Sequence, residues 1–219
     1  MNETVKSRRP YKSVRRQEQA IQTRREILAA AGLLFRESGY AGTSMPVIAA
    51  RARVVVETIY RAFGSKAGLF KAVIEAAVAG GSARADVPVE ERPAIRAVIE
   101  EPDPRRQVAL YAATQPGIHR RSGPLLGALR DAAGADPELR SLWNEIEAGR
   151  LAGQGRFVGM LAEQGRLRAG LSVEEGRDIV WTLSSLAVYA MLVGTRGWSA
   201  EEYEAWLSAA LVRELLPAE

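Results

Sequence analysis

His119 is the one histidine of this 219-residue chain, which has no cysteine. A histidine-based zinc site, thiolate ligands, a cysteine nucleophile and a serine–histidine relay are therefore not expected, and we expect neither a cofactor nor catalysis. Residues 1–71 carry 14 lysines and arginines against 5 acidic residues, a balance of +9, and residues 72–219 carry 16 against 21, a balance of −5. This asymmetry favours a first part that binds a polyanion. Charge alone leaves open a merely solubilising role for these arginines.

The helices that position these cations can be predicted from the spacing of apolar residues and from residues that cap or end helices. Apolar residues from Ala20 to Phe35 recur every three or four positions, which predicts a helix that ends near Gly39. Thr43 or Ser44 then caps a short helix over 45–52, a turn follows near Arg53, and a second short helix spans 55–62. A fourth helix begins at Lys66 and ends at Gly80-Gly81. Residues 1–20 are basic and contain a proline, so we expect a flexible arm.

The remainder of the chain is also predicted to be helical. Asp103-Pro104 and Asp136-Pro137 are typical helix starts, and Ser172 with Glu175 and Ser199 with Glu202 form capping boxes. No stretch alternates as a strand would, so the fold class is all-α. The longest apolar run, Ile179 to Val193, is shorter than a membrane span, and no secretory signal opens the chain. A cytoplasmic protein with no membrane partner is expected.

Two short helices across a tight turn, after a longer helix, predict a helix-turn-helix. The stretches GYAGTSMPVIA (residues 39–49) and TIYRAFGSKAGLF (residues 58–70) resemble the signature of the tetracycline-repressor (TetR) family. The resemblance covers about residues 21–81. It implies a basic arm over 1–20, a DNA-binding domain over 21–81 with its helix-turn-helix at about 44–63, and a helical domain over 82–219 for effector binding and dimerisation.

The resemblance also implies which side chains contact DNA. Those that match the family's phosphate-binding positions are Thr43, Ser44, Thr58, Tyr60 and Lys66. Exposed residues of the second short helix are the candidate base readers: Val55, Val56, Glu57 and Arg61. A valine can contact a thymine methyl group, and a glutamate can accept from a cytosine amine. Because this set reads bases weakly, we expect DNA shape and the arm to contribute to specificity.

Two residues depart from the family's pattern in the turn. Arg53 stands where the family usually has glycine, and Val55 stands where it usually has a serine or threonine cap. A left-handed residue other than glycine costs roughly 1–2 kcal/mol, and a missing cap costs roughly 1 kcal/mol. Because several valines follow one another here, the sequence does not determine the first residue of the recognition helix to better than one position.

In the family, the larger domain binds an effector and its last two helices form the homodimer interface. The stretch from Ile179 to Ala190 is apolar nearly all round, as a helix buried on two sides must be, with the core helix of a monomer as the alternative. The predicted interface residues are Leu186, Tyr203, Trp206, Leu207, Ala210 and Leu211. The candidate effector-pocket residues are Tyr111, His119, Trp143, Phe157 and Trp181, although aromatic residues on helices more often belong to the plain core. The pair Arg120-Arg121 after His119 predicts a helix end near the surface.

The resemblance therefore implies a transcriptional regulator that binds an inverted repeat in double-stranded DNA as a homodimer. We expect a repressor that a small molecule of unknown identity releases from its operator. The alternative is a DNA-binding regulator of the same fold without an effector, acting as an activator or an architectural protein. An apolar cavity in the larger domain would separate the two.

Overall fold

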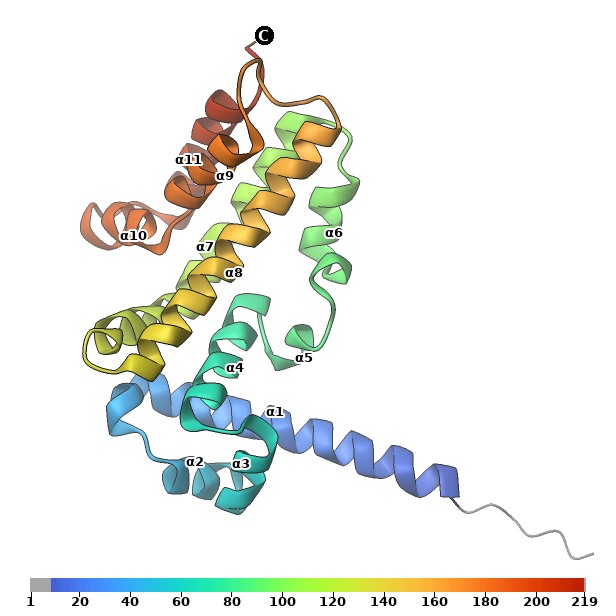
Figure 1. Cartoon of the computed structure of the whole chain (residues 1–219), viewed down its shortest axis with the longest axis vertical. Helices are drawn as coiled ribbons and strands as arrows, with labels where there is room; N and C mark the ends of the chain where they lie inside the picture. The colour runs from blue at the N-terminus through green and yellow to red at the C-terminus, as the bar shows by residue number, and fades with distance from the viewer. Residues whose placement is uncertain (1–8, 219) are drawn as a thin grey trace, which may run out of the picture. The chain divides into compact units, whose positions relative to one another are not determined.

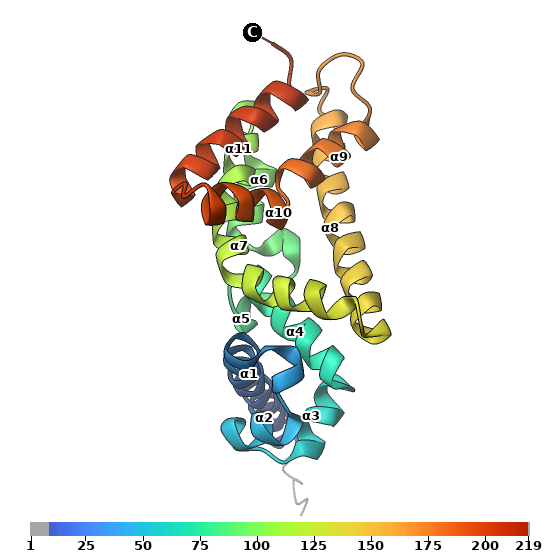
Figure 2. The same cartoon turned by 90° about the vertical axis from the view of Figure 1, so that its left-hand side faces the viewer.

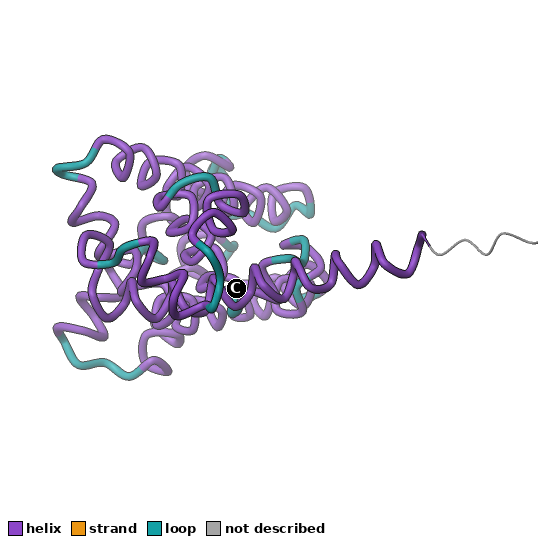
Figure 3. Tube along the Cα trace, turned by 90° about the horizontal axis from the view of Figure 1, so that it is seen from below, coloured by secondary structure: helices purple, strands orange, loops and turns teal. Residues whose placement is uncertain are grey.

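A computed structural model describes residues 9–218 of the chain, with side chains from Arg15 onward. Helices, turns and short loops make up this whole range, and no strand occurs within it (Figures 1 and 3). The expected all-α class is confirmed. Two compact units divide between Val73 and Ile74, inside helix α4 (Lys66–Ala79), rather than at the Gly80-Gly81 pair that ends it. The first eight residues of the expected arm lie outside the described range.

The first unit consists of one long helix, two short ones and the beginning of α4. Helix α1 spans Arg9–Gly42, α2 spans Met45–Ala52 and α3 spans Val56–Phe63. Gly39 interrupts α1 with a positive φ of 67°, at the residue where the helix was expected to end. The start of α1 differs from the expectation, because residues 9–19 are helical instead of a flexible arm. Arginine, glutamine and glutamate are good helix formers, and a proline in the first turn loses no hydrogen bond.

An aromatic cluster holds α1 against α4 within the first unit. The ring centroids of Phe35 and Phe70 lie 4.6 Å apart, and those of Tyr40 and Phe70 lie 5.2 Å apart. Side chains from all four helices complete this core: Ile27, Ala31, Leu34, Ile48, Ala49, Ile59, Leu69 and Val73. The helical spacing seen in the sequence thus becomes one apolar interior that fixes α2 and α3 on α1.

The second unit begins with short elements and continues with long helices. After the end of α4 come α5 (Ser82–Ala85), the 3₁₀ helix η1 (Val89–Glu91), α6 (Pro93–Glu100), α7 (Pro104–Ala133), α8 (Pro137–Glu163), α9 (Val173–Leu183), α10 (Leu186–Tyr189), the π-helix η2 (Ala190–Thr195) and α11 (Ala200–Leu215). Asp103 and Asp136 accept backbone N–H groups at the starts of α7 and α8. Both predicted capping boxes are present, at the starts of α9 and α11. These four predicted helix starts are confirmed.

Helix α7 is the centre of the second unit. Helices α6, α8 and α11 pack against it, and α9 packs against α8 and α11 (Figures 1 and 2). The residues buried at these contacts include Val108, Ala112, Phe157, Val158, Leu161, Val180, Tyr203, Leu207, Leu211 and Leu215. The core therefore lies between the long helices, and it leaves one side of α9 and α10 uncovered.

The apolar run after Ser172 does not form one continuous helix. It breaks at Ser184 and Ser185, where the Ser184 hydroxyl donates to the Val180 carbonyl at 2.6 Å and Ser185 caps α10. By length and composition, residues 173–195 could cross a membrane. This corrects the expectation that the apolar run is too short for a membrane span. Only 11% of the most apolar window is buried, whereas a core helix of a soluble protein is mostly buried. Most of this stretch is therefore not buried within the described residues.

Candidate nucleic-acid interface and effector site

Arg53 and Val55 set the geometry of the helix-turn-helix. Arg53 ends α2 in the left-handed conformation with φ 55° and ψ 42°, and the Val54 N–H donates back to the Ala49 carbonyl at 3.0 Å. Val55 is the N-cap residue and has an extended backbone. Helix α3 therefore begins at Val56, which fixes the first residue that the sequence left undetermined. A valine has no polar atom with which to cap a helix. The fold therefore carries both local costs, roughly 1–2 kcal/mol for the left-handed arginine and roughly 1 kcal/mol for the missing cap.

Helix α3 buries one side and leaves the other open. Ile59 is fully buried, whereas Val55 is 64% exposed and Tyr60 is 48% exposed. Glu57 and Arg61 are also exposed, and Val56 and Thr58 are half-buried. The residues expected to read bases thus stay at least partly accessible on α3 and its N-cap, and so do Thr58 and Tyr60, the two residues of α3 expected to bind phosphate.

Thr43 is an exception among the predicted DNA contacts. Its side chain is buried, and its hydroxyl donates to the carbonyl oxygens of Leu34 at 3.1 Å and Gly39 at 2.7 Å. The expectation of a phosphate contact is corrected, because this hydroxyl ties the end of α1 to the start of α2. Ser44 is the exposed N-cap residue of α2, and within the described range its hydroxyl makes no capping bond. Ser44 is therefore the hydroxyl that can face a phosphate here.

Lys66 opens α4 beside the aromatic cluster. Its Nζ lies 4.2 Å from the centroid of the Tyr40 ring, a cation–π geometry. Partial burial lowers the pKa of this ammonium from its ordinary value. The Tyr40 ring thus restrains the lysine at the first turn of the helix, as a phosphate contact of fixed register requires.

Four of the five predicted effector residues meet around Ser184. The Tyr111 hydroxyl lies 3.4 Å from the Ser184 Oγ, and the His119 Nε2 lies 3.1 Å from the Ser184 carbonyl oxygen. Phe157 stacks on Tyr111 with centroids 4.4 Å apart. Trp181 joins through Arg150, as described below. The residues Tyr111, His119, Phe157, Trp181 and Ser184, with Arg150 and Gln154, are called the Ser184 cluster from here on.

The polar members of the Ser184 cluster were not among the residues predicted from the sequence. The Gln154 amide lies 3.1 Å from the Ser184 Oγ. The Arg150 guanidinium lies 4.6 Å from the Trp181 ring centroid and donates to the Trp181 carbonyl at 2.8 Å, while Glu147 pairs with Arg150 at 3.0 Å. The two serines that interrupt the apolar run were the available signal. Trp143, about two turns before Arg150 on α8, is in none of the cluster contacts that the structure describes.

His119 is neutral and has an unused acceptor. Burial is the main cause that lowers its pKa to about 4. Because Nε2 faces a carbonyl oxygen, it carries the proton, and Nδ1 is then a buried acceptor without a partner among the described residues. The predicted helix end at His119 is wrong, since this residue is buried in the middle of α7. Arg121 is instead half-buried and bonds carbonyls of α4.

Two further buried polar atoms near the cluster have no partner among the described residues. They are the Tyr203 hydroxyl and the Trp181 Nε1. Burial raises the pKa of Tyr203, which stays protonated at neutral pH. Tyr189 stacks on His119 at 4.8 Å and meets Tyr203 edge-on at 5.0 Å. A buried polar atom without a hydrogen bond costs about 1–3 kcal/mol, and such atoms are usually satisfied by water or a ligand.

Comparison with known proteins decides what this helix-turn-helix is. Residues 27–73 match the family model of the bacterial regulatory proteins, tetR family. The helix-turn-helix lies within this matched stretch and is similar to that of the tetR family. No curated protein is similar enough in sequence to count as a match. The match ends at the residue where the first compact unit ends.

The whole chain also has the fold of TetR-family regulators. NalD of Pseudomonas aeruginosa, the secondary repressor of the MexAB-OprM multidrug efflux pump, is 22% identical with a TM-score of 0.68, covering 91% of this chain and 100% of its own. A transcriptional regulator from Saccharomonospora viridis in complex with choline is 19% identical with a TM-score of 0.64, covering 90% and 99%. FadR of Bacillus subtilis in complex with stearoyl-CoA is 20% identical with a TM-score of 0.62, covering 85% and 94%. At these identities, the likeness establishes the fold.

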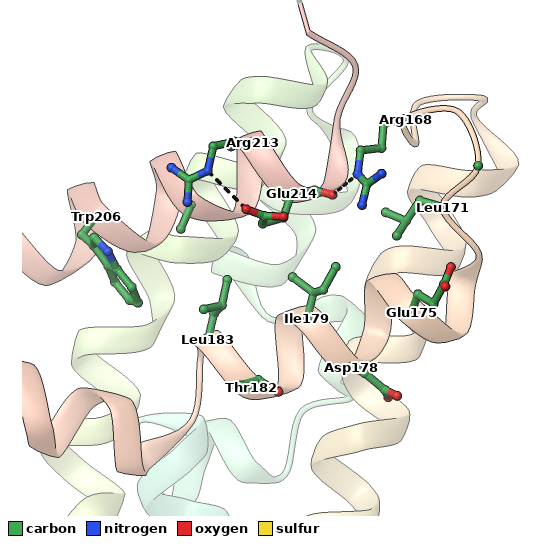
Figure 4. Close-up of a pocket in the computed structure, with 12 residues that line it drawn as sticks. Arg168, Leu171, Glu175, Asp178, Ile179, Thr182, Leu183, Trp206, Arg213 and Glu214 are labelled. Atoms are coloured by element: carbon green, nitrogen blue, oxygen red, sulfur yellow. Dashed lines mark hydrogen bonds and ion pairs between the residues drawn. The ribbon is translucent and has the colours of Figure 1, made fainter.

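Helices α9 and α11 border an open groove of about 730 Å³ (Figure 4). Ile179, Leu183 and Trp206 contribute apolar surface to it, and Asp178, Arg168 and Arg213 stand at its edges. Trp206 and Leu186 of the predicted interface are partly exposed. The other four, Tyr203, Leu207, Ala210 and Leu211, are buried within one copy. Helix α11 packs there against α7 and α9, and a role of these four residues in a dimer interface stays a prediction.

Proposed function

We propose that this protein is a transcriptional repressor that binds an inverted repeat in double-stranded DNA as a homodimer and leaves it when a small molecule binds. The accessible side of α3, presented by a tetR-family helix-turn-helix, carries this proposal. Ser44, Thr58, Tyr60 and Lys66 are assigned to phosphates, and Val55, Val56, Glu57 and Arg61 to base edges. Thr43 has a structural role.

The DNA-binding half is tested with fragments from upstream of the gene. Fluorescence anisotropy at 50–200 mM salt should show one fragment bound more tightly than duplexes of shuffled sequence. Affinity should fall tenfold or more over this range, because phosphate contacts release counterions. Equal affinity for every duplex, or an affinity that ignores salt, would contradict the assignment.

The groove between α9 and α11 supports a second copy of this chain as the partner. The uncovered apolar stretch of residues 173–195 adjoins it, and two half-sites one helical turn apart require two recognition helices. Covering this surface in a dimer makes a membrane span unnecessary, so we place the protein in the cytoplasm. A purified dimer without detergent supports the assignment, whereas sedimentation with membranes and extraction by detergent alone would contradict it.

The Ser184 cluster is the proposed effector site. Its aromatic rings suit an apolar ligand body, and the free acceptor of His119 suits a ligand group that donates a hydrogen bond. Two proteins of the same fold were solved with choline and with stearoyl-CoA, which supports a ligand in this domain. A ligand that lowers operator affinity a hundredfold needs about 2.7 kcal/mol of coupling free energy between the two sites. Thermodynamic linkage then requires that bound DNA weakens ligand binding by the same factor.

Two observations favour the alternative of a regulator without an effector. Tyr189 packs directly on His119, and the groove between α9 and α11 does not include any residue of the Ser184 cluster. A thermal-shift screen of lipophilic metabolites, with choline and stearoyl-CoA included, separates the two functions. A hit that releases the operator supports the ligand-responsive repressor. Hits that leave operator affinity unchanged would favour the alternative.

A further inference from the structure

A second groove, of about 510 Å³, lies within the first unit between α1 and α3. Three arginines, Arg16, Arg24 and Arg61, line it together with the hydroxyl residues Thr23 and Thr58. None of the described lining residues is acidic. The remaining lining is mostly small and apolar side chains from α1, α3 and the turn before α3. The groove therefore combines cationic edges with an apolar floor.

Contacts within the unit hold the inner cations of this groove in place. The Arg24 Nη1 donates to the Ala62 carbonyl at 3.1 Å, and the Arg24 guanidinium lies 4.3 Å from the centroid of the Phe63 ring. The Arg61 Nη2 donates to the Thr58 Oγ1 at 3.4 Å. Arg16 is exposed, about two turns further out on α1. The inner wall is thus preorganised, while Arg16 is free to turn toward a ligand.

The cationic surface continues along α1 beyond the groove. Helix α1 runs on past α3 as a single rod (Figure 1). Between residues 9 and 25 the sequence has six arginines and lysines and one acidic residue, Glu18. A long row of like charge fits an extended polyanion better than a small anion, whose charge would meet only one or two of these side chains.

We propose that this groove holds the sugar–phosphate backbone of the strand that borders the major groove occupied by α3. A helix in the major groove has a phosphate backbone on each side, so a surface beside α3 must face one of them. Phosphate oxygens would meet Arg16, Arg24 and the two threonine hydroxyls, and deoxyribose carbons would meet the apolar floor, while Arg61 keeps its assignment to base edges. The helical extension of α1 then becomes a second DNA-contacting element that adds affinity without reading sequence. This inference rests on the proposed DNA binding.

Two neighbouring arginines of α1 provide a matched test. Arg16 lines the groove, whereas Arg15 has the same charge and exposure but does not line it. We expect Arg16→Gln to weaken binding to a 30-base-pair duplex of arbitrary sequence about five- to tenfold at 0.1 M salt. It should also reduce the slope of log K against log salt concentration by about 0.9, the value of one lost phosphate contact. Arg15→Gln should weaken binding less than twofold. Thr23→Val, which removes a hydroxyl and no charge, should weaken binding about two- to threefold with the slope unchanged.

Equal losses for Arg15→Gln and Arg16→Gln would overturn the proposal, because they would indicate diffuse attraction instead of a defined groove. An unchanged affinity for Arg16→Gln would overturn it as well. Circular dichroism confirms that each variant is folded, and both arginines are exposed. If Tyr60→Phe weakens binding while the two arginine variants behave alike, the α1 groove is wrong and the proposed function stands. If the wild-type protein binds no duplex, the proposed function itself fails.

Discussion

The Arg121 Nε of α7 donates a hydrogen bond to the carbonyl oxygen of Ala77 in the last turn of α4, at 2.9 Å. Its Nη2 also donates to the Val78 carbonyl at 3.4 Å. Arg121 follows His119 by two residues on the same helix, and α4 begins directly after the helix-turn-helix. Arg121 therefore joins α7, two residues after His119, to the last turn of α4.

Arg121→Gln should lower the free energy of unfolding by about 1–3 kcal/mol, because two carbonyls at the end of α4 lose a charged donor. Urea denaturation monitored by circular dichroism measures this change. Arg120→Gln is the matched control, since Arg120 is exposed, and we expect it to change stability by less than about 0.5 kcal/mol. A similar effect of the two substitutions would show that Arg121 does not hold α4.

Substitutions in and after α3 should separate phosphate binding from base reading. Tyr60→Phe and Lys66→Ala should weaken binding to all duplexes by similar factors, whereas Glu57→Ala should mainly change the preferred bases. Selection of bound sequences from a random duplex pool, followed by anisotropy on selected and shuffled DNA, measures both effects. Lys66 is assigned wrongly if Lys66→Ala alters the selected sequence and leaves binding to shuffled DNA intact.

Stability should fall as the pH is lowered from about 6.5 to about 4, in part because of His119. Its pKa is about 4 in the folded protein and near 6.5 when unfolded, so the unfolded state binds the proton first. The contribution is fully present above pH 6.5 and amounts to about 3 kcal/mol. His119→Gln keeps a donor for the Ser184 carbonyl and cannot titrate in this range. Urea denaturation at several pH values should therefore show a flatter profile for the variant, and parallel profiles would contradict this role of His119.

Tyr203→Phe should leave stability unchanged or raise it by about 1 kcal/mol, because the buried hydroxyl that it removes has no partner among the described residues. Thermal unfolding without ligand measures this effect. With a hit from the effector screen, the variant should show a smaller thermal shift than the wild type if the hydroxyl serves a ligand. A marked loss of stability without ligand would instead indicate that a buried water satisfies the hydroxyl.

Two adjacent residues of α11 should respond differently to the same substitution. Trp206 is partly exposed at the groove between α9 and α11, so Trp206→Glu should give folded monomers. Leu207 is fully buried in its own copy, so Leu207→Glu should unfold the chain, as a buried unpaired charge does. Analytical ultracentrifugation and circular dichroism distinguish these outcomes. An intact dimer of the Trp206→Glu variant would place the interface elsewhere.

Local sequence was sufficient for several helix starts of this protein and for the buried position of α3 at Ile59. Asp103, Asp136 and the two capping boxes mark helix starts through bonds that span two or three residues, and such short-range chemistry can be read from the sequence. The start of α4 at Lys66 follows for the same reason, from the Ser65 Oγ that accepts the Gly68 N–H at 3.0 Å. The departures at Arg53 and Val55 were also visible in advance, because each depends on the conformation of one residue.

Packing between distant helices decided the rest. An apolar stripe on α11 predicts that its residues are buried, but periodicity cannot tell whether the same copy or a partner covers them. Tyr203, Leu207, Ala210 and Leu211 are buried within one copy. Thr43 has the residue type of a phosphate ligand, yet its hydroxyl is used by the Leu34 carbonyl nine residues earlier. His119 is neutral because it is buried, and its Nε2 faces the carbonyl oxygen of Ser184, 65 residues away. Each of these properties depends on which surfaces meet in three dimensions, and short-range patterns along the chain contain no information about that.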